Sequence, residues 1–204
     1  VRLVHNRGRY MQEAVPVGIG AMAAVLGVPG DAVAARLAEV RSGVVEIANW
    51  NSDDQIVISG DKAAVEEALA AIQAPRSVVL PVSAPFHSRL MKPAEERLAA
   101  DLDAVAFADP CFPIVTNVDA RLIRTGAEAR DALKRQVSRS VLWTKSMAVL
   151  RDMGIEACVE CGPGKVLAGL LKRIGRGWPK PPAVYNVENG EGLEKAKEAL
   201  IGPL

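Results

Sequence analysis

The stretch VVEIANWNSDDQIVISG (44–60) joins two β-rich runs through a polar Ser-Asp-Asp turn. β-Branched and aromatic runs separated by a short polar segment are typical of a hairpin, so we predict strands at 44–51 and 55–60. A short buried strand is predicted before the hairpin at 19–27, and another strand after it at 76–83. Helical periodicity follows Asp31 and Asp61, which we expect to act as N-caps.

The predicted order over residues 18–82 is therefore β-α-β-β-α-β, the ferredoxin-like arrangement. The flanking segments alternate differently, with helices predicted at 1–15, 91–105, 126–137, 141–153, about 166–174 and 192–200, and strands at 112–118, 155–161 and 183–189. Strands that alternate with helices favour a parallel sheet covered on both faces. We predict an α/β protein in which a small subdomain, 18–82, is inserted into a larger core made of 1–17 and 83–204.

Composition excludes several classes of function. The 204 residues carry a formal net charge of +1, which gives no electrostatic reason to expect nucleic-acid binding. No apolar run approaches the length that crosses a bilayer. Three cysteines are an odd number, which argues against a disulfide framework and fits a reducing cytoplasm. A helical pattern without N-cap or initiator Met at Val1 leads us to expect the rear part of a longer protein, with trimming as the alternative.

Two residues are candidates for chemistry. His87 follows a strand and Pro85 at the junction between the predicted subdomain and the core, where clefts form, and a neutral imidazole there could act as a general base. The alternative is a histidine that only packs. Arg7 lies in the first predicted helix and offers a guanidinium fork to a carboxylate, the alternative being a solvated arginine. Gly8 beside it would allow another segment to approach closely.

Other motifs are less specific. GPGKVL (162–167) joins a strand to a helix and could hold an anion, but it matches no nucleotide motif, so a tight turn is favoured. Cys158 and Cys161 lie inside an apolar strand and are interpreted as buried small side chains, and His5 has no companion ligands for a metal. A group of basic residues is interpreted as solvated or as a landing site for an acidic or phosphate-bearing carrier: Arg130, Lys134, Arg135, Arg139, Lys165, Lys172, Arg173, Arg176 and Lys180.

Several segments, in this order, resemble the malonyl-CoA:acyl carrier protein transacylase family over nearly the whole chain. They are RGRYMQEAVPVGIGAMAAVLG (7–27), NWNSDDQIVISG (49–60), LPVSAPFHSRLMKPA (80–94), PIVTNVDA (113–120), RDALKRQV (130–137), VLWTKSM (141–147) and ECGPGKVLAGLLKRI (160–174). The resemblance implies an incomplete α/β-hydrolase-like core that carries the ferredoxin-like insert.

The resemblance also assigns roles. It implies that His87 is the general base that activates a serine, and that the backbone carbonyl of Gln136 orients the imidazole in place of a carboxylate. Arg7, in the Arg-Gly-X-X-Met-Gln segment, corresponds to the arginine that binds the malonyl carboxylate. Phe86 corresponds to a residue beside the substrate, where its ring would crowd an α-methyl on a larger extender unit. No metal is implied.

The implied reaction moves a malonyl group from malonyl-CoA to the phosphopantetheine thiol of acyl carrier protein through a malonyl-serine, in fatty-acid biosynthesis in the cytoplasm. Coenzyme A thioester is then a substrate, and no cofactor, nucleic acid or membrane is implied. The 204 residues contain no Gly-X-Ser-X-Gly elbow, and Ser59 and Ser88 lack that context. We expect the serine and an oxyanion-hole glutamine to precede Val1, and the chain alone to be inactive.

Two other interpretations remain. The chain is alternatively a non-catalytic module that binds an acyl-CoA or a carrier protein without a nucleophile. It is alternatively a ferredoxin-like ligand-binding domain with an unrelated tail. The sequence leaves open whether the acyl group serves fatty-acid or polyketide synthesis, and it gives no oligomeric state.

Overall fold

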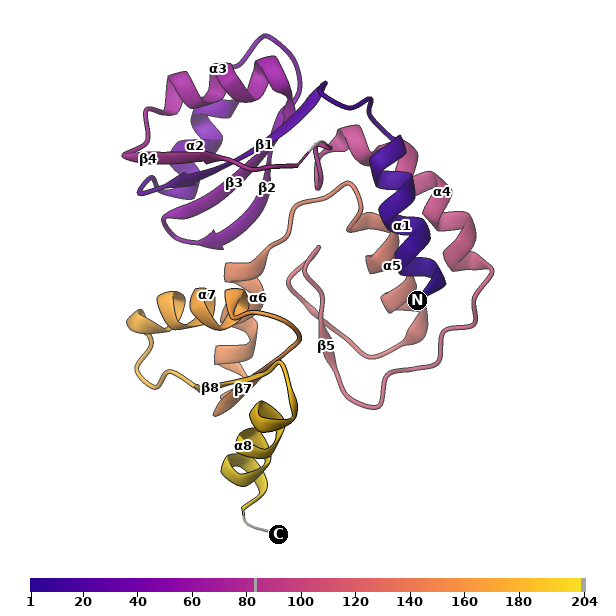
Figure 1. The fold of residues 1–204 in the computed structure, drawn as a ribbon, viewed down its shortest axis with the longest axis vertical. Helices are drawn as coiled ribbons and strands as arrows, with labels where there is room; N and C mark the ends of the chain where they lie inside the picture. The colour runs from indigo at the N-terminus through magenta and orange to yellow at the C-terminus, as the bar shows by residue number, and fades with distance from the viewer. Residues whose placement is uncertain (83, 203–204) are drawn as a thin grey trace. The chain divides into compact units, whose positions relative to one another are not determined.

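The computed structural model describes residues 1–82 and 84–202 (Figure 1). Ser83, which belongs to the predicted strand at 76–83 and to the predicted core, lies outside the described residues, as do residues 203 and 204. The chain forms two compact units, Val1–Ser146 and Met147–Leu204, and each is described by itself. No helix within the described residues is long and apolar enough to cross a membrane.

A four-stranded antiparallel sheet dominates the first unit. Its strands are β1 (Gly20–Leu26), β2 (Val45–Ser52), β3 (Gln55–Asp61) and β4 (Arg76–Val79), in the spatial order β2-β3-β1-β4. The hairpin predicted at 44–60 is confirmed as β2 and β3, with register shifts after Ile47 and Trp50. The strand predicted at 76–83 is shorter than expected and ends at Val79.

Alternation along these strands gives the sheet two different faces. Helices α2 (Gly30–Leu37) and α3 (Lys62–Ile72) cover one face (Figure 1), where Val33 and Val65 pack against Val25, Ile56 and Ile58. Residues offset by one in the strands, such as Met22 and Val57, form a separate apolar cluster against which Phe86 packs. Because side chains alternate along each strand, one face of the sheet packs against the helices and the other packs against the segment that carries His87.

The two expected aspartate N-caps differ from the prediction. Helix α2 begins two residues earlier than predicted, with Pro29 at the N-cap, so Asp31 lies in the first turn, where its charge suits the helix dipole. Asp61 is at the N-cap of α3, but its side chain makes no capping hydrogen bond there. Its carboxylate instead accepts from the backbone N–H of Val44 at 2.8 Å, because β2 and β3 bring the two residues together.

Helices make up much of the rest of the first unit: α1 (Arg2–Glu13), the short 3-10 turn η1 (Arg89–Met91), α4 (Lys92–Asp103), α5 (Gly126–Arg135) and the start of α6 (Trp143–Asp152). Tyr10 and Met11 of α1 pack with Leu98 and Leu102 of α4. The helix predicted at 91–105 ends at Asp103, so Val105 lies beyond α4 and is 39% exposed.

The strand predicted at 112–118 is wrong except for β5 (Ile114–Val115), which pairs with β6 (Leu122–Ile123). Pro113 cannot donate to a strand ladder, and the chain reverses directly after β5. The backbone N–H of Ala120, at φ +51°, donates to the carbonyl of Thr116 at 2.8 Å, and Thr116 N–H donates to the carbonyl of Arg121 at 3.0 Å.

The second unit contains β7 (Ala157–Cys161) and β8 (Ala183–Val187), which are parallel, with α7 (Val166–Ile174), the 3-10 turn η2 (Gly175–Gly177) and α8 (Gly190–Ile201). The predicted parallel pairing is present, but only between two strands. The expectation of a buried strand at 155–161 is wrong: Val159 is 40% exposed and Cys161 is exposed, because β7 has no second strand neighbour within the described residues.

Candidate functional site

His87 lies in the connection between β4 and η1, and its backbone is left-handed, with φ +59°. A residue with a Cβ seldom adopts this conformation, and such strain is concentrated at functional sites. The neighbouring residues hold the turn: the hydroxyl of Ser88 donates to the carbonyl of Pro85 at 2.7 Å, and both residues are buried. The backbone conformation of His87 therefore sets the direction of its half-buried imidazole.

The imidazole of His87 contacts the residue that ends helix α5. Its Nδ1 lies 3.0 Å from the backbone carbonyl oxygen of Gln136, across 49 positions of sequence. A carbonyl oxygen can only accept, so Nδ1 carries the hydrogen and Nε2 keeps its lone pair. The last carbonyls of a helix lack intrahelical partners and carry a partial negative charge, so this contact also stabilises a protonated imidazole.

The side chain of Gln136 holds the loop that follows α5. Its Nε2 donates to the carbonyls of Arg139 at 2.9 Å and Ser140 at 3.3 Å, while its buried Oε1 has no partner within the described residues. The loop is in turn attached to strand β2, where the hydroxyl of Ser140 donates to the carbonyl of Ile47 at 2.5 Å. The backbone of Val141 donates to Ala48 at 2.7 Å.

The segment that carries His87 is attached to the same strand. Glu46 of β2 accepts from the backbone N–H of Arg89 at 2.7 Å, and its carboxylate lies 3.2 Å from the Arg89 guanidinium. Three consecutive residues, 46–48, therefore fix both partners of the His87–Gln136 contact. Sequence reasoning missed Glu46, because a charged residue in a strand gives no sign of the loop that it will meet.

Electrostatics keep His87 neutral. Burial lowers the pKa of its imidazole, and the positive charge of Arg7 acts in the same direction, while hydrogen bonding to the backbone of Gln136 and of Arg139 opposes both. Burial also lowers the pKa of Arg7, which is half-buried in α1. Arg7 has no carboxylate partner within the described residues, so its guanidinium is a cation without a counter-ion beside a neutral base.

Phe86 precedes His87 and is half-buried. Its ring packs against the cluster shared by α1 and α4 and against the cluster on the sheet face opposite α2 and α3. These contacts show a packing role.

Several weaker motifs acquire structural explanations. The first N–H groups of helix α7 are occupied by the carboxylate of Glu160, which accepts from Leu167 at 3.0 Å and Ala168 at 2.8 Å, so the tight turn explains GPGKVL better than an anion site. Cys158 is half-buried, and burial raises its thiol pKa, whereas Cys161 is exposed, contrary to expectation. No described segment approaches Gly8, so that expectation is also wrong.

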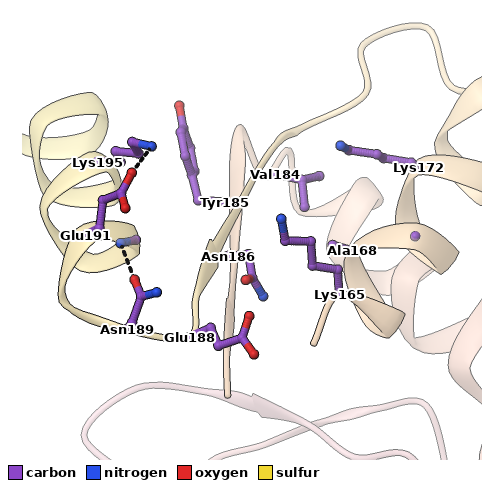
Figure 2. Close-up of a pocket in the computed structure, with 12 residues that line it drawn as sticks. Lys165, Ala168, Lys172, Val184, Tyr185, Asn186, Glu188, Asn189, Glu191 and Lys195 are labelled. Carbon is purple, nitrogen blue, oxygen red and sulfur yellow. Dashed lines mark hydrogen bonds and ion pairs between the residues drawn. The ribbon is translucent and has the colours of Figure 1, made fainter. Parts of the chain in front are cut away.

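No group of three or more potential metal ligands occurs within residues 1–82 and 84–202. A cavity of about 500 Å³ lies in the second unit, between α7, β8 and α8. Figure 2 shows Lys165 and Lys172 of the basic group at this cavity, together with the Glu191–Lys195 ion pair. It contains none of the predicted catalytic residues. Others of the basic group are paired with carboxylates, as Lys134 is with Asp103 at 2.6 Å.

The chain is similar to proteins of one kind. It is 49% identical over 178 residues to the malonyl CoA-acyl carrier protein transacylase of Escherichia coli strain K12, a match that covers 85% of this chain and 58% of that protein. An acyl carrier protein S-malonyltransferase from Vibrio cholerae superposes with a TM-score of 0.91 at 40% identity, covering 96% of this chain and 64% of that one.

A malonyl-transacylase solved in complex with a type II polyketide synthase acyl carrier protein gives a TM-score of 0.92 at 39% identity, over 97% of this chain and 64% of that one. The chain thus spans less than two thirds of the length of each of these proteins. No family model matches the sequence.

Proposed function

We propose that this chain belongs to the malonyl-CoA:acyl carrier protein transacylase family, and that it supplies the base and the carboxylate-binding arginine for malonyl transfer to acyl carrier protein. The observation that carries the proposal is the 3.0 Å contact between His87 Nδ1 and the Gln136 carbonyl oxygen, which leaves Nε2 as the basic atom. The positive charge of Arg7, which lowers the pKa of His87, supports it.

The proposed chemistry is a two-step acyl transfer. His87 Nε2 takes the proton of a serine hydroxyl as its oxygen attacks the malonyl thioester carbon. The C–S bond breaks, and the coenzyme A sulfur leaves with that proton. The phosphopantetheine thiol then gives its proton to Nε2 as its sulfur attacks the ester carbonyl carbon of the malonyl-serine. The C–O bond breaks, and the serine oxygen leaves with that proton. The 204 residues hold no Gly-X-Ser-X-Gly elbow, and the serine is proposed to come from sequence outside them.

Arg7 is proposed to bind the free carboxylate of the malonyl group through its two-pronged guanidinium. A half-buried cation without a counter-ion is costly unless an anion reaches it, and the substrate supplies that anion. An acetyl group lacks the carboxylate and leaves the cation unpaired, so the site discriminates between the two acyl groups. Phe86 is proposed to limit the size of the acyl group beside His87.

Finer features of the fold and setting are also proposals. The order β1-α2-β2-β3-α3-β4 supports a ferredoxin-like subdomain at 18–82, inserted into an incomplete α/β-hydrolase-like core of 1–17 and 83–204. We propose that coenzyme A enters as a substrate thioester without a further cofactor, and that the reaction serves fatty-acid synthesis in the cytoplasm. Lys165 and Lys172, without ion-pair partners within the described residues, are proposed to contact the acidic carrier protein.

A hybrid enzyme tests the proposal. The 204 residues replace the matching part of the E. coli relative, whose remaining sequence is retained, and malonyl transfer from malonyl-CoA to acyl carrier protein is measured. We expect transfer by the hybrid and none by the 204 residues alone. His87→Ala in the hybrid is expected to lower the rate by about 10²- to 10⁴-fold, the usual contribution of a general base.

The alternative, a non-catalytic binding module, gives a different pattern. It predicts that the 204 residues bind malonyl-CoA while the folded hybrid shows no transfer. A hybrid whose activity survives His87→Ala unchanged would reject the proposed role of the histidine.

A further inference from the structure

Arg135 lies one residue before Gln136, at the end of helix α5, and its guanidinium makes an unusually complete set of contacts. Its Nη1 and Nη2 each lie 2.6 Å from one carboxylate oxygen of Asp119, and its Nε lies 2.8 Å from Asp131, one turn earlier in the same helix. A parallel pair of charge-assisted hydrogen bonds fixes orientation as well as distance.

Asp119 is itself held in place. It lies in the turn between β5 and β6, which is closed by the Ala120–Thr116 and Thr116–Arg121 backbone hydrogen bonds at 2.8 and 3.0 Å. The hydrogen bond from Arg135 is the main cause that lowers the pKa of the Asp119 carboxyl, so the group is ionised at neutral pH. Arg121 also approaches it, at the longer distance of 3.7 Å.

This link acts at the point where a helix is weakest. The last carbonyls of a helix have no intrahelical partner, so the final turn frays unless other contacts hold it. Here the final turn supplies the Gln136 carbonyl that contacts His87. Arg135 immediately precedes Gln136, so its attachment to the closed β5–β6 turn fixes the direction of the Gln136 carbonyl.

We propose that Arg135, clamped by Asp119, is a positioning residue that keeps the Gln136 carbonyl aimed at His87 Nδ1 and thereby selects the tautomer with a basic Nε2. The inference rests on the proposed function for its consequence in catalysis. The inference itself concerns only the direction of the Gln136 carbonyl and the tautomer of the His87 ring.

Other basic residues of the same helix provide a contrast. Lys134 pairs with Asp103 of α4 at 2.6 Å, and Arg130 approaches the same carboxylate at 3.8 Å. These contacts attach α5 to α4 and leave the β5–β6 turn untouched. Removing the Lys134 ion pair therefore leaves the link to the β5–β6 turn intact, whereas removing the Arg135 ion pairs breaks it. Lys134→Met is thus a matched control for Arg135→Met.

The test is nitrogen NMR of the ring atoms in the 204-residue chain, which contains only two histidines, His5 and His87. In the wild type we expect a protonated Nδ1 and an unprotonated Nε2 at His87. Arg135→Met should move both signals toward the average of two exchanging tautomers, Arg135→Lys should move them less, and Lys134→Met should leave them unchanged. His5, exposed on α1, should not respond to any of the three.

An Arg135→Met protein that keeps the wild-type circular dichroism and the wild-type His87 signals would overturn the inference. If this variant does not fold, Asp119→Asn is measured instead, because it weakens the clamp and retains the contact with Asp131. In the hybrid enzyme, Arg135→Met should lower kcat with little change in KM for malonyl-CoA. An inactive hybrid would reject the proposed function, whereas unchanged ring signals would reject the clamp alone.

Discussion

At the scale of single residues, the site depends on a histidine in a left-handed conformation. The φ of +59° costs a residue with a Cβ about 1–2 kcal/mol, and the buried hydrogen bond between Ser88 and Pro85 helps to retain it. In return, the ring meets a neutral acceptor, which fixes its tautomer without adding a charge. A neutral carbonyl leaves His87 a weaker base than a carboxylate would.

The lowered pKa of His87 gives a prediction with a definite sign. Burial and Arg7 lower the pKa of His87 in the folded protein. The unfolded chain, in which His87 keeps its ordinary pKa of about 6.5, therefore binds more protons than the folded protein as the pH falls toward and below that value. The free energy of unfolding should therefore fall as the pH drops from about 7 through the ordinary value toward the folded pKa. Urea unfolding at several pH values should show a smaller loss for His87→Gln than for the wild type.

A proton NMR titration supplies the direct check, with His5→Gln used to assign the two imidazole signals. The midpoint of His87 is expected below its ordinary value. A midpoint above that value, or the same pH dependence of unfolding in both proteins, would contradict the electrostatic account.

At the scale of elements, strand β2 is the frame of the site. Glu46 holds the His87 segment through Arg89, and the carbonyls of Ile47 and Ala48 hold the loop after Gln136. Helix α5 contributes its C-terminal end, and its other end is closed by a capping box between Thr125 and Glu128. The distance between base and orienting carbonyl is thus set by one strand and one helix.

Removing the Glu46 carboxylate tests this frame. In Glu46→Ala, the amide of Arg89 loses its acceptor, and its hydrogen exchange should accelerate by about fivefold, as expected for the loss of about 1 kcal/mol. Glu39→Ala, which breaks the exposed pair with Arg36 on α2, serves as the control and should leave that amide unchanged. Equal exchange rates in all three proteins would show that β2 does not hold the segment.

The local elements were largely predictable from sequence, whereas their irregularities were not. Period-two alternation and helical spacing located β1, β2, β3 and most helices, because those patterns encode which face is buried. The same patterns failed at 112–118, where a turn competes with a strand. At 155–161 they located strand β7 but not its exposure, because apolar composition does not reveal how many strand neighbours exist.

At the scale of the whole molecule, the site depends on contacts between residues far apart in the chain, which the sequence alone does not reveal. The resemblance pointed to His87, Arg7 and Gln136, but periodicity alone cannot bring together residues 49 positions apart. Their meeting depends on the bulged register of β2 and on the end of α5. Arg135 was interpreted from the sequence as one of a basic group, either solvated or a landing site, and nothing in the sequence indicated its pairing with Asp119.

If His87 and Arg7 are the base and the carboxylate clamp of a malonyl transferase, as proposed, the selectivity between acyl groups must depend on Arg7. Malonyl and acetyl transfer are compared in the hybrid enzyme with Arg7 and with Arg7→Ala. Loss of a desolvated charge partner costs about 2–5 kcal/mol, so malonyl transfer should fall by about 30-fold or more while acetyl transfer changes little. Equal losses for the two acyl groups would contradict the account.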